Sequence, residues 1–394
     1  MKNKKYLILF TMTAMLCVMW VSVLGGGKSK NHKYQEYIKK AEQHEQKEAY
    51  ITAADNYLKA LKIYPDDYGL MIKSAENYMK CDDRNGFLQY CDMAADKNAS
   101  ADEPYLLKAE YYSKAEEYED AINILNCAPK KDMGDKVERM LSTLQYKFSD
   151  SYHSYSDMKY FYDGYASVQN EKGHWGIADS EGNIRLTARY DEIGGAYNKD
   201  KDIVSVCEGG EWYFSDLKGR KKYVPDNYYS FLGTYSEGFA PFEYKGKYGY
   251  MDLEYNEYSC EFDYAGAFLN GVAAVKKNGK WALIDTRFKN VTEFIYDDIK
   301  TDCYGFCIND PVITVSRNGE EYNINKNGKK TDNDMKYSCG LTPVCDDNMW
   351  GYADMSGKMV IEPQYQDVNP FTETGTASVK ENGSWHVIKL YSYK

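Results

Sequence analysis

The chain contains residue types that can do chemistry, but their spacing matches no familiar active site. It has five histidines, and no two of them stand at the spacing of a metal site: His32, His44, His153, His174 and His386. There is no H-E-x-x-H motif, and no G-x-S-x-G sequence marks a nucleophilic serine. We therefore expect neither a histidine-based active site nor a bound metal or cofactor.

Acidic clusters are the next candidates for chemistry. Asp82-Asp83 and Asp297-Asp298 lack the glycine and the closing glutamate of a calcium loop, so we expect them to act in turns and helix caps. A carboxylate pair for glycoside hydrolysis has no fixed spacing along a chain. An uncharacterised hydrolase therefore stays open as an alternative function.

The cysteines are scattered. Cys17 lies in an apolar stretch near the amino terminus, and nine others follow it: Cys81, Cys91, Cys127, Cys207, Cys260, Cys303, Cys307, Cys339 and Cys345. No pair has the C-x-x-C spacing of a zinc or redox site, although local bridges from Cys303 to Cys307 or from Cys339 to Cys345 stay open. The scatter favours structural thiols, with Cys91 and Cys127 at interior positions.

The composition excludes some classes of function. Lys and Arg number 49 against 60 Asp and Glu, and the net charge of -11 across 394 residues offers no basic field for nucleic acid. Forty tyrosines and an aromatic content of 15% are typical of a folded chain.

An uncharged apolar stretch runs from Tyr6 to Leu24. At 1.5 Å per helical residue it is long enough to cross the hydrocarbon core of a bilayer, and no small-x-small cleavage site follows it. We expect residues 1–33 to form a signal-anchor transmembrane helix with a linker. Lysines flank the apolar stretch on both sides, so the positive-inside rule gives no clear orientation in the membrane. Short amino-terminal tails usually stay in the cytoplasm. We expect a single-pass cell-membrane protein with most of the chain outside the cytoplasm.

A period of 34 residues governs the next part of the chain. Small or apolar residues recur at that spacing in three registers: Ala41, Ala75 and Ala109; Ala53, Phe87 and Ala121; and Ala60, Ala94 and Ala128. Small side chains let two helices approach closely, and a repeated unit buries its apolar face by stacking on its copies. The period predicts three helix-turn-helix hairpins.

This pattern resembles the tetratricopeptide repeat family from Tyr34 to Met133, with Asp135 to Phe148 as a capping helix. The first small position carries Ala where the family usually has Gly. The resemblance implies a helical domain over residues 34–150, with a groove for a peptide or partner protein and the first helix of each hairpin near its concave face. Glu42, Glu76 and Glu110, again 34 apart, would make that groove acidic and favour a basic partner segment. The alternative is that they are ordinary solvated residues.

A second repeat occupies residues 151–394. Aromatic residues recur 33 to 37 residues apart, with one gap of 69: Trp175, Trp212, Tyr248, Trp281, Trp350 and Trp385. A degenerate copy around Asn318-Gly319 fills the gap and brings the count to seven units. Alternating apolar residues around short turns predict a hairpin and a third strand in each unit. An aspartate follows four residues later in five units, and such recurrence indicates a structural role: Asp179, Asp216, Asp252, Asp285 and Asp354.

These units resemble the WG-repeat family, whose Trp-Gly pair is present at Trp175-Gly176 and Trp350-Gly351. The resemblance implies an all-β repeat array without a general catalytic role. An open solenoid and a closed propeller both stay open, because a propeller blade usually has four strands in about 40 residues and these units are shorter.

The recurring Trp residues are expected to pack between neighbouring units, because aromatic rings bury large areas. Surface tyrosines off the register are better candidates for ligand contact than these Trp residues; they include Tyr228, Tyr229 and Tyr255. Together these patterns predict a multidomain protein with an α-solenoid and a β-repeat domain, acting as a non-catalytic scaffold or binding protein at the bacterial cell envelope. The alternatives are a cell-wall carbohydrate-binding protein that uses exposed aromatics and the hydrolase named above.

Overall fold

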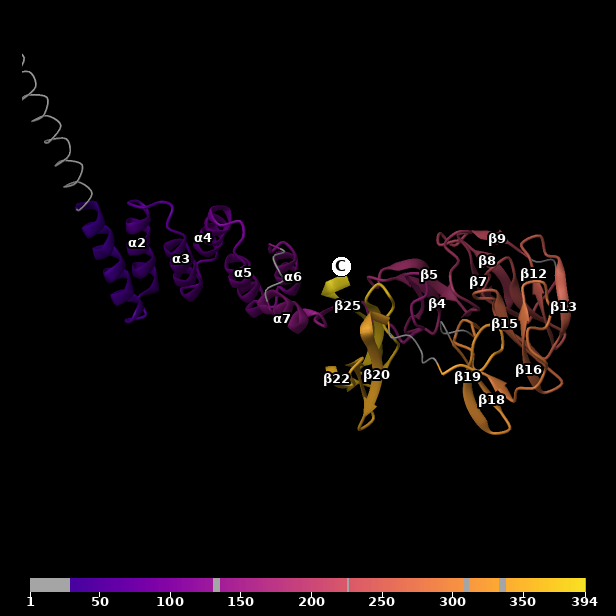
Figure 1. The fold of residues 1–394 in the computed structure, drawn as a ribbon. Coiled ribbons are helices and arrows are strands. Elements are labelled where there is room, and N and C mark those ends of the chain that lie inside the picture. Colours follow the sequence, from indigo (N-terminus) through magenta and orange to yellow (C-terminus); the bar gives the residue numbers. More distant parts are fainter. Residues whose placement is uncertain (1–28, 130–134, 225–226, 308–311, 333–337, 394) are drawn as a thin grey trace, which may run out of the picture. The chain divides into compact units, whose positions relative to one another are not determined.

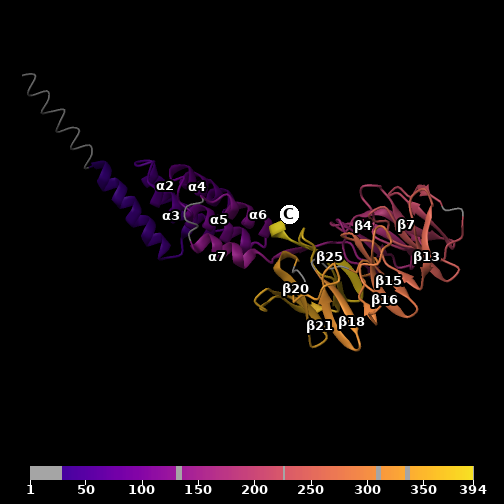
Figure 2. The same ribbon diagram turned by 45° about the vertical axis from the view of Figure 1, so that its right-hand side comes forward.

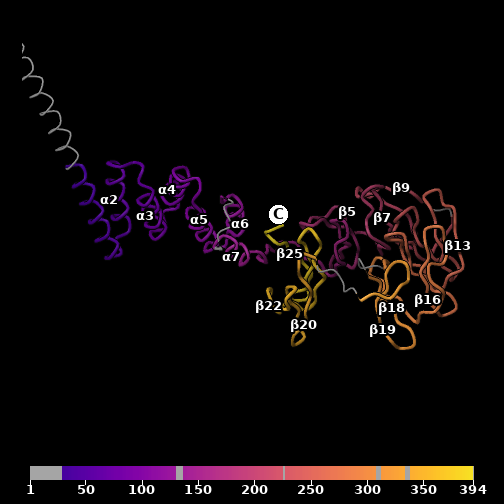
Figure 3. The backbone as a smooth tube through the Cα atoms, in the orientation of Figure 1, coloured from indigo at the N-terminus to yellow at the C-terminus, as the bar shows by residue number. Residues whose placement is uncertain are grey.

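The computed structural model describes residues 29–129, 135–224, 227–307, 312–332 and 338–393. The chain divides into two compact units, Met1–Gln145 and Tyr146–Lys394 (Figures 1 and 3). The first is helical and the second is built from β-strands. The predicted membrane span, residues 6–24, lies outside the described residues. Along the described ranges, no helix is both long and apolar enough to cross a bilayer.

The helical unit is a row of antiparallel hairpins (Figure 2). Its helices cover residues 29–45, α2 (Tyr50–Leu61), α3 (Tyr68–Lys80), α4 (Arg84–Lys97), α5 (Glu103–Lys114), α6 (Tyr118–Asn126) and α7 (Asp135–Leu144). From α2 to α7 each helix packs on the next. The three predicted hairpins and the capping helix are confirmed. The first helix already covers residues 29–33, which we expected to be linker, and the capping helix ends at Leu144, four residues before the predicted Phe148.

The 34-residue period appears in the backbone as well as in the side chains. The alanines of all three registers are buried. Glu48, Asp82 and Glu116 end the first helix of each hairpin with φ of 58°, 59° and 60°. After each, an amide donates to the carbonyl five residues earlier, as in Ala49 N to His44 O at 2.9 Å. Such left-handed ends satisfy helix carbonyls that would otherwise lack a donor.

Aspartates begin two of the helices. The Asp67 carboxylate accepts from Leu70 N at 3.1 Å, and Asp83 accepts from Gly86 N at 3.0 Å. These are side-chain N-caps. The expected turn and cap roles of Asp82 and Asp83 are therefore confirmed.

The described residues of the second unit form seven sheets. In chain order, the first sheet contains β2 (Asp157–Met158), β3 (Tyr165–Gln169), β4 (Trp175–Asp179) and β5 (Ile184–Tyr190), and the second contains β6 (Glu192–Ile193), β7 (Val204–Glu208), β8 (Glu211–Ser215) and β9 (Lys221–Tyr223). The third sheet contains β10 (Phe231–Leu232), β11 (Ala240–Tyr244), β12 (Lys247–Met251) and β13 (Glu257–Phe262), and the fourth contains β14 (Tyr264–Ala265), β15 (Val272–Lys277) and β16 (Lys280–Asp285).

The remaining three sheets follow the same plan. The fifth sheet contains β17 (Asp298–Ile299), β18 (Ile313–Arg317) and β19 (Glu320–Ile324), and the sixth contains β20 (Leu341–Asp346), β21 (Met349–Asp354) and β22 (Met359–Tyr365). The seventh contains β23 (Asp367–Val368), β24 (Thr376–Glu381), β25 (Ser384–Leu390) and β1 (Phe148–Asp150). Short 3-10 turns lie at Ser338–Gly340 and Tyr391–Tyr393.

The two ends of this unit meet in the seventh sheet. β1 pairs antiparallel with β25, with Phe148 opposite Leu390 and Asp150 opposite Ile388. The first strand of the unit therefore completes the sheet made by the last strands, and the array is a closed, propeller-like ring of seven blades. The predicted count of seven units is confirmed, and closure decides between the propeller and the open solenoid.

The compact β unit begins at Tyr146, a few residues before the boundary between residues 150 and 151 that the composition suggested. The difference comes from β1, a three-residue strand that belongs to the last blade. Six of the sheets also begin with a two-residue strand that the sequence did not indicate, as in Glu192–Ile193.

The register aromatics pack between successive blades. Trp212 and Trp385 are 7% and 6% exposed, and the ring of Trp212 lies in a core with Leu232 and Phe242 of the next blade. Trp175, Trp281 and Trp350 are only half-buried at the edges of the corresponding cores. The predicted packing role is confirmed, but these three rings are not fully enclosed.

The glycine of the Trp-Gly pair is required by the neighbouring strand. A Cβ on Gly176 would lie 2.4 Å from Leu186 O, and one on Gly351 would lie 2.4 Å from Ile361 O. In both blades the pairing register shifts beside the glycine, which brings the outer strand over it. Trp281-Ala282 needs no glycine, because no strand pairs with the outer side of β16 in its sheet.

Candidate functional site

Acidic side chains gather on the first helices of the helical unit. Glu42 and Glu45 belong to the helix over residues 29–45, and Glu76 belongs to α3. Burial, reinforced by the carboxylates of Glu45, Glu42 and Glu76, raises the pKa of the Tyr57 phenol. Lys73 is the basic side chain among them and pairs with Glu76 at 3.1 Å. We call Glu42, Glu45, Glu76 and Tyr57 the acidic face.

Glu45 is fixed in this face by two donors. The Tyr57 hydroxyl donates to its Oε2 at 3.1 Å, and Asn77 Nδ2 donates to its Oε1 at 2.6 Å. Asn77 Oδ1 is buried without a partner among the described residues. Sequence reasoning missed Glu45, because the positions 34 and 68 residues further on are Met79 and Ser113.

The structure brings two of the three predicted site residues together. Glu42 and Glu76 both lie near Tyr57, whereas Glu110 is on α5 and pairs with Lys114 at 2.7 Å. Glu42 and Glu110 are exposed and Glu76 is half-buried.

The three predicted surface tyrosines fall into different environments. Tyr228 is 83% exposed, as expected. Tyr229 is 5% exposed, which corrects its expected role in ligand contact. Its ring packs on Phe242, and its hydroxyl donates to Glu257 Oε1 at 2.6 Å. Tyr255 is half-buried with φ of 63° in the turn before β13. Neither of the last two presents a free ring to a ligand.

The recurring aspartates are occupied by their own turns. Asp179 Oδ1 accepts from Glu181 N at 3.0 Å and from Asn183 N at 2.9 Å. The same two-donor turn recurs at the other four positions, which are Asp216, Asp252, Asp285 and Asp354. Their expected structural role is confirmed.

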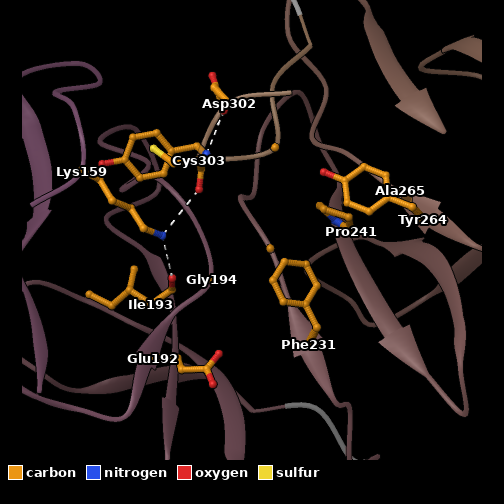
Figure 4. A pocket seen from close by; sticks show the side chains of 13 residues that line it. Lys159, Glu192, Ile193, Gly194, Phe231, Pro241, Tyr264, Ala265, Asp302 and Cys303 are labelled. Carbon is orange, nitrogen blue, oxygen red and sulfur yellow. Dashed lines mark hydrogen bonds between the residues drawn. The ribbon is translucent and has the colours of Figure 1, made fainter. Parts of the chain in front are cut away.

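The β unit holds a cavity of about 270 Å³ among the short first strands of its blades (Figure 4). Its wall includes Lys159 after β2, Glu192 of β6, Phe231 of β10, Tyr264 of β14 and Asp302 after β17. Because each residue comes from the first strand of a different blade or just after it, the cavity lies where the blades converge. We call it the axial cavity.

A loop after β17, residues 301–307, closes part of the axial cavity. The Tyr304 hydroxyl donates to Tyr160 O at 2.9 Å, and Thr234 Oγ1 donates to Tyr304 O at 2.7 Å. Ala267 N donates to Gly305 O at 2.8 Å. One loop of the fifth blade thereby contacts the first, third and fourth blades.

Two half-buried ionisable groups are found here, Lys159 beside the loop and Asp302 within it. Burial lowers the pKa of the Lys159 amine, which donates to Ile193 O at 3.3 Å and to Cys303 O at 3.5 Å. Burial raises the pKa of the Asp302 carboxyl, although Tyr160, Tyr304 and Phe306 all donate to it. Perturbed groups beside a cavity are typical of functional sites.

The nine cysteines after residue 28 are all free thiols, so neither of the local bridges that stayed open is formed. Cys91 is buried as predicted, but Cys127 is exposed because it follows the last turn of α6. Cys303 is exposed at the edge of the axial cavity, and partial desolvation of its sulfur there raises the pKa of the thiol to about 11. Within the described ranges, no group of three or more His, Cys, Asp or Glu side chains is placed to hold a metal ion.

A family model described as WG containing repeat matches residues 175–212, 258–281 and 350–385 of this chain. The first and last of these segments each run from one register Trp to the next. The β unit therefore contains WG repeats. No curated protein matches the chain.

Several solved structures are similar to parts of the chain. The Myceliophteria thermophila Cps50 (Swd1) β-propeller domain is 7% identical to this chain, with a TM-score of 0.38. The match covers 62% of this chain and 99% of the propeller domain. BamB from Moraxella catarrhalis is 13% identical, with coverages of 57% and 82% and a TM-score of 0.32. The TPR2B domain of yeast Sti1, in its pHsp70 complex, is 19% identical, with coverages of 28% and 94% and a TM-score of 0.25. At these TM-scores the similarities assign no ligand or partner to this chain.

Proposed function

We propose that this chain is a non-catalytic, membrane-anchored binding protein of the bacterial cell envelope. Its helical unit binds a basic segment of a partner protein, and its β unit supplies a second binding surface. Residues 6–24 form the anchor, and both repeat units follow it outside the cytoplasm.

The acidic face is the observation that carries this proposal. Glu42, Glu45 and Glu76 lie close enough together to act on one phenol, that of Tyr57. Lys73 offsets part of that charge through its bond to Glu76. Like charges gathered on one surface favour a partner of opposite charge and repel one of the same charge. A Lys- or Arg-rich segment therefore suits this face, and a carboxylate-rich segment does not.

Charge reversal tests the proposal. The full-length chain is titrated with a synthetic Lys–Ser repeat peptide and with the matching Glu–Ser peptide. We expect the basic peptide alone to bind, more weakly at high salt because exposed charges are screened. The combined variant Glu42→Lys, Glu45→Lys and Glu76→Lys should lose about tenfold or more in affinity.

A matched variant separates the acidic face from overall charge. Asp55, Asp96 and Asp120 are exposed on α2, α4 and α6, the second helices of the hairpins. Changing all three to Lys alters the net charge equally, and binding should then be nearly unchanged. An equal loss in both triple variants, or binding of the acidic peptide, would contradict the proposal. Far-ultraviolet circular dichroism checks that both variants remain helical.

A further inference from the structure

The axial cavity is a second site whose chemistry differs from that of the acidic face. Figure 4 shows the Lys159 amino group and Ile193 on one side, and the Phe231 and Tyr264 side chains on the other. All of the lining residues belong to the β unit. The volume of about 270 Å³ is at the lower end for small-molecule sites, so the cavity suits one small ring.

Lys159 has unused hydrogen-bonding capacity. An ammonium group has three N–H donors. Two of them reach carbonyl oxygens at 3.3 and 3.5 Å, which is long for an N–H···O bond. The third has no acceptor among the described residues. The ammonium also lies 5.5 Å from the ring centres of Trp175 and Tyr304, which keep it in place.

Of the two carboxylates, only Glu192 is available to a ligand. Asp302 Oδ1 accepts from Tyr304 N and Phe306 N, and Oδ2 accepts from the Tyr160 hydroxyl. Glu192 is exposed at the cavity, and its carboxylate has no hydrogen bond or ion pair among the described residues. The cavity thus offers one cationic donor and one anionic acceptor.

The opposite wall is aromatic. The Phe231 and Tyr264 rings are half-buried, and both lie against Tyr248, at 6.0 and 5.6 Å between ring centres. Trp212 supports Phe231 at 5.7 Å, and Trp281 supports Tyr264 at 5.1 Å. These contacts give the two cavity-lining rings a fixed orientation without covering them.

We infer that the axial cavity binds a neutral saccharide ring. Hydroxyl groups both donate and accept, so neighbouring hydroxyls can serve Lys159 and Glu192 together. The C–H face of the ring would pack on Phe231 and Tyr264, which supply apolar area at low entropic cost. A net anion would be repelled by Glu192 and a net cation by Lys159. A neutral polyol meets neither repulsion.

Saturation-transfer-difference NMR of the full-length chain tests this site. The probes are glucose, galactose, mannose and N-acetylglucosamine, with glucuronate and glucosamine as charged comparators. We expect at least one neutral sugar to bind with Kd of about 1 mM, and each charged comparator to bind more weakly than its neutral counterpart. Glu192→Gln and Phe231→Ala should each weaken binding about tenfold.

Controls keep folding separate from recognition. Glu192→Gln keeps the shape of an exposed side chain and is the variant least able to disturb the fold. Tyr322→Ala removes a half-buried ring outside the cavity and should leave sugar binding unchanged. The inference is overturned if no neutral sugar binds up to about 50 mM, if a charged comparator binds more tightly, or if Glu192→Gln and Tyr322→Ala behave alike. None of these outcomes bears on the peptide site of the helical unit.

Discussion

Asp216 illustrates how a single side chain holds one repeat together. Its side chain is fully buried, and Oδ1 accepts from Lys218 N and Arg220 N, both at 2.9 Å. Oδ2 accepts from Arg220 Nε at 2.6 Å. Burial disfavours the charged form, but the bonds to Arg220 and Lys218 outweigh it and lower the pKa of the carboxyl.

A change of Asp216 should therefore make stability less dependent on pH. Because the folded-state pKa is depressed below the ordinary value of about 3.9, the stabilisation is complete above that pH and is lost as pH falls through the folded value. We expect Asp216→Asn to cost about 2 kcal/mol near pH 6. The difference from wild type should shrink toward pH 2.5 in urea unfolding curves. A difference that stays constant across this range would contradict the role given to the carboxylate.

Cys303 offers a second test at the residue scale. Partial desolvation raises the pKa of its thiol to about 11, and only the thiolate is alkylated. Its rate of reaction with iodoacetamide, followed by mass spectrometry of the labelled peptide, should rise about tenfold per pH unit from pH 7 to 10. A rate that levels off near pH 8 would mean that the pKa of the thiol is not raised.

At the scale of elements, the ring depends on a strand of three residues. Ser149 of β1 lies opposite Lys389 of β25, and the adjoining amides Ser151 N and Tyr391 N donate across the same pair of strands. The Phe148 ring packs on the core between the sixth and seventh blades. Closure of the ring therefore rests on these backbone hydrogen bonds, on the Phe148 ring and on a core in which Tyr155 and Val168 of the first blade pack with Trp385 of the seventh.

Breaking this pairing should open the ring. Proline lacks the amide donor, so Ser149→Pro should destabilise the β unit by about 3 kcal/mol, measured by urea unfolding with tryptophan fluorescence. Ser149→Ala keeps the backbone donor and should cost much less. If both variants unfold at the same urea concentration, β1 does not close the ring.

The helices were predictable because the 34-residue period is carried by alanines that must be buried for hairpins to stack. The long strands were predictable from apolar alternation beside short turns. The two-residue inner strands were not, because a pair such as Glu192-Ile193 is too short to show the alternation that indicates a strand, although similar pairs recur at Asp298-Ile299 and Asp367-Val368. Pairing of β1 with β25 was also invisible, because it joins segments about 240 residues apart.

The candidate sites were predicted only in part. Recurrence along the chain indicated Glu42, Glu76 and Glu110, but Glu45 does not recur. The axial cavity was not predicted, because an acidic residue at the position of Glu192 also recurs as Asp157, Asp298 and Asp367 and therefore did not mark one blade as special. One signal was present: Asp302-Cys303-Tyr304-Gly305 matches the Asp-x-x-Gly turn at Asp179-Ser180-Glu181-Gly182, at a place where no turn of the repeat belongs.

At the scale of the whole molecule, most of the recurring residues serve stacking and turns. The register aromatics fill the spaces between blades, the aspartates hold turns, and the alanines bring helices together. Glu45 does not recur in the helical repeats. In the β unit, Glu192 takes a position that Asp157, Asp298 and Asp367 hold in other blades, and Lys159 takes the position of Lys300. We propose that both repeat units present their binding surfaces to the same compartment, because the apolar stretch at residues 6–24 precedes both of them.

Protease shaving of intact cells that express the full-length chain with a carboxyl-terminal epitope tests this arrangement most directly. We predict that the chain sediments with membranes, resists extraction by carbonate, and loses its epitope to protease without cell lysis. A cytoplasmic marker protein should stay intact in the same samples. A soluble chain, or an epitope that is cleaved only after lysis, would contradict a membrane-anchored binding protein displayed outside the cytoplasm.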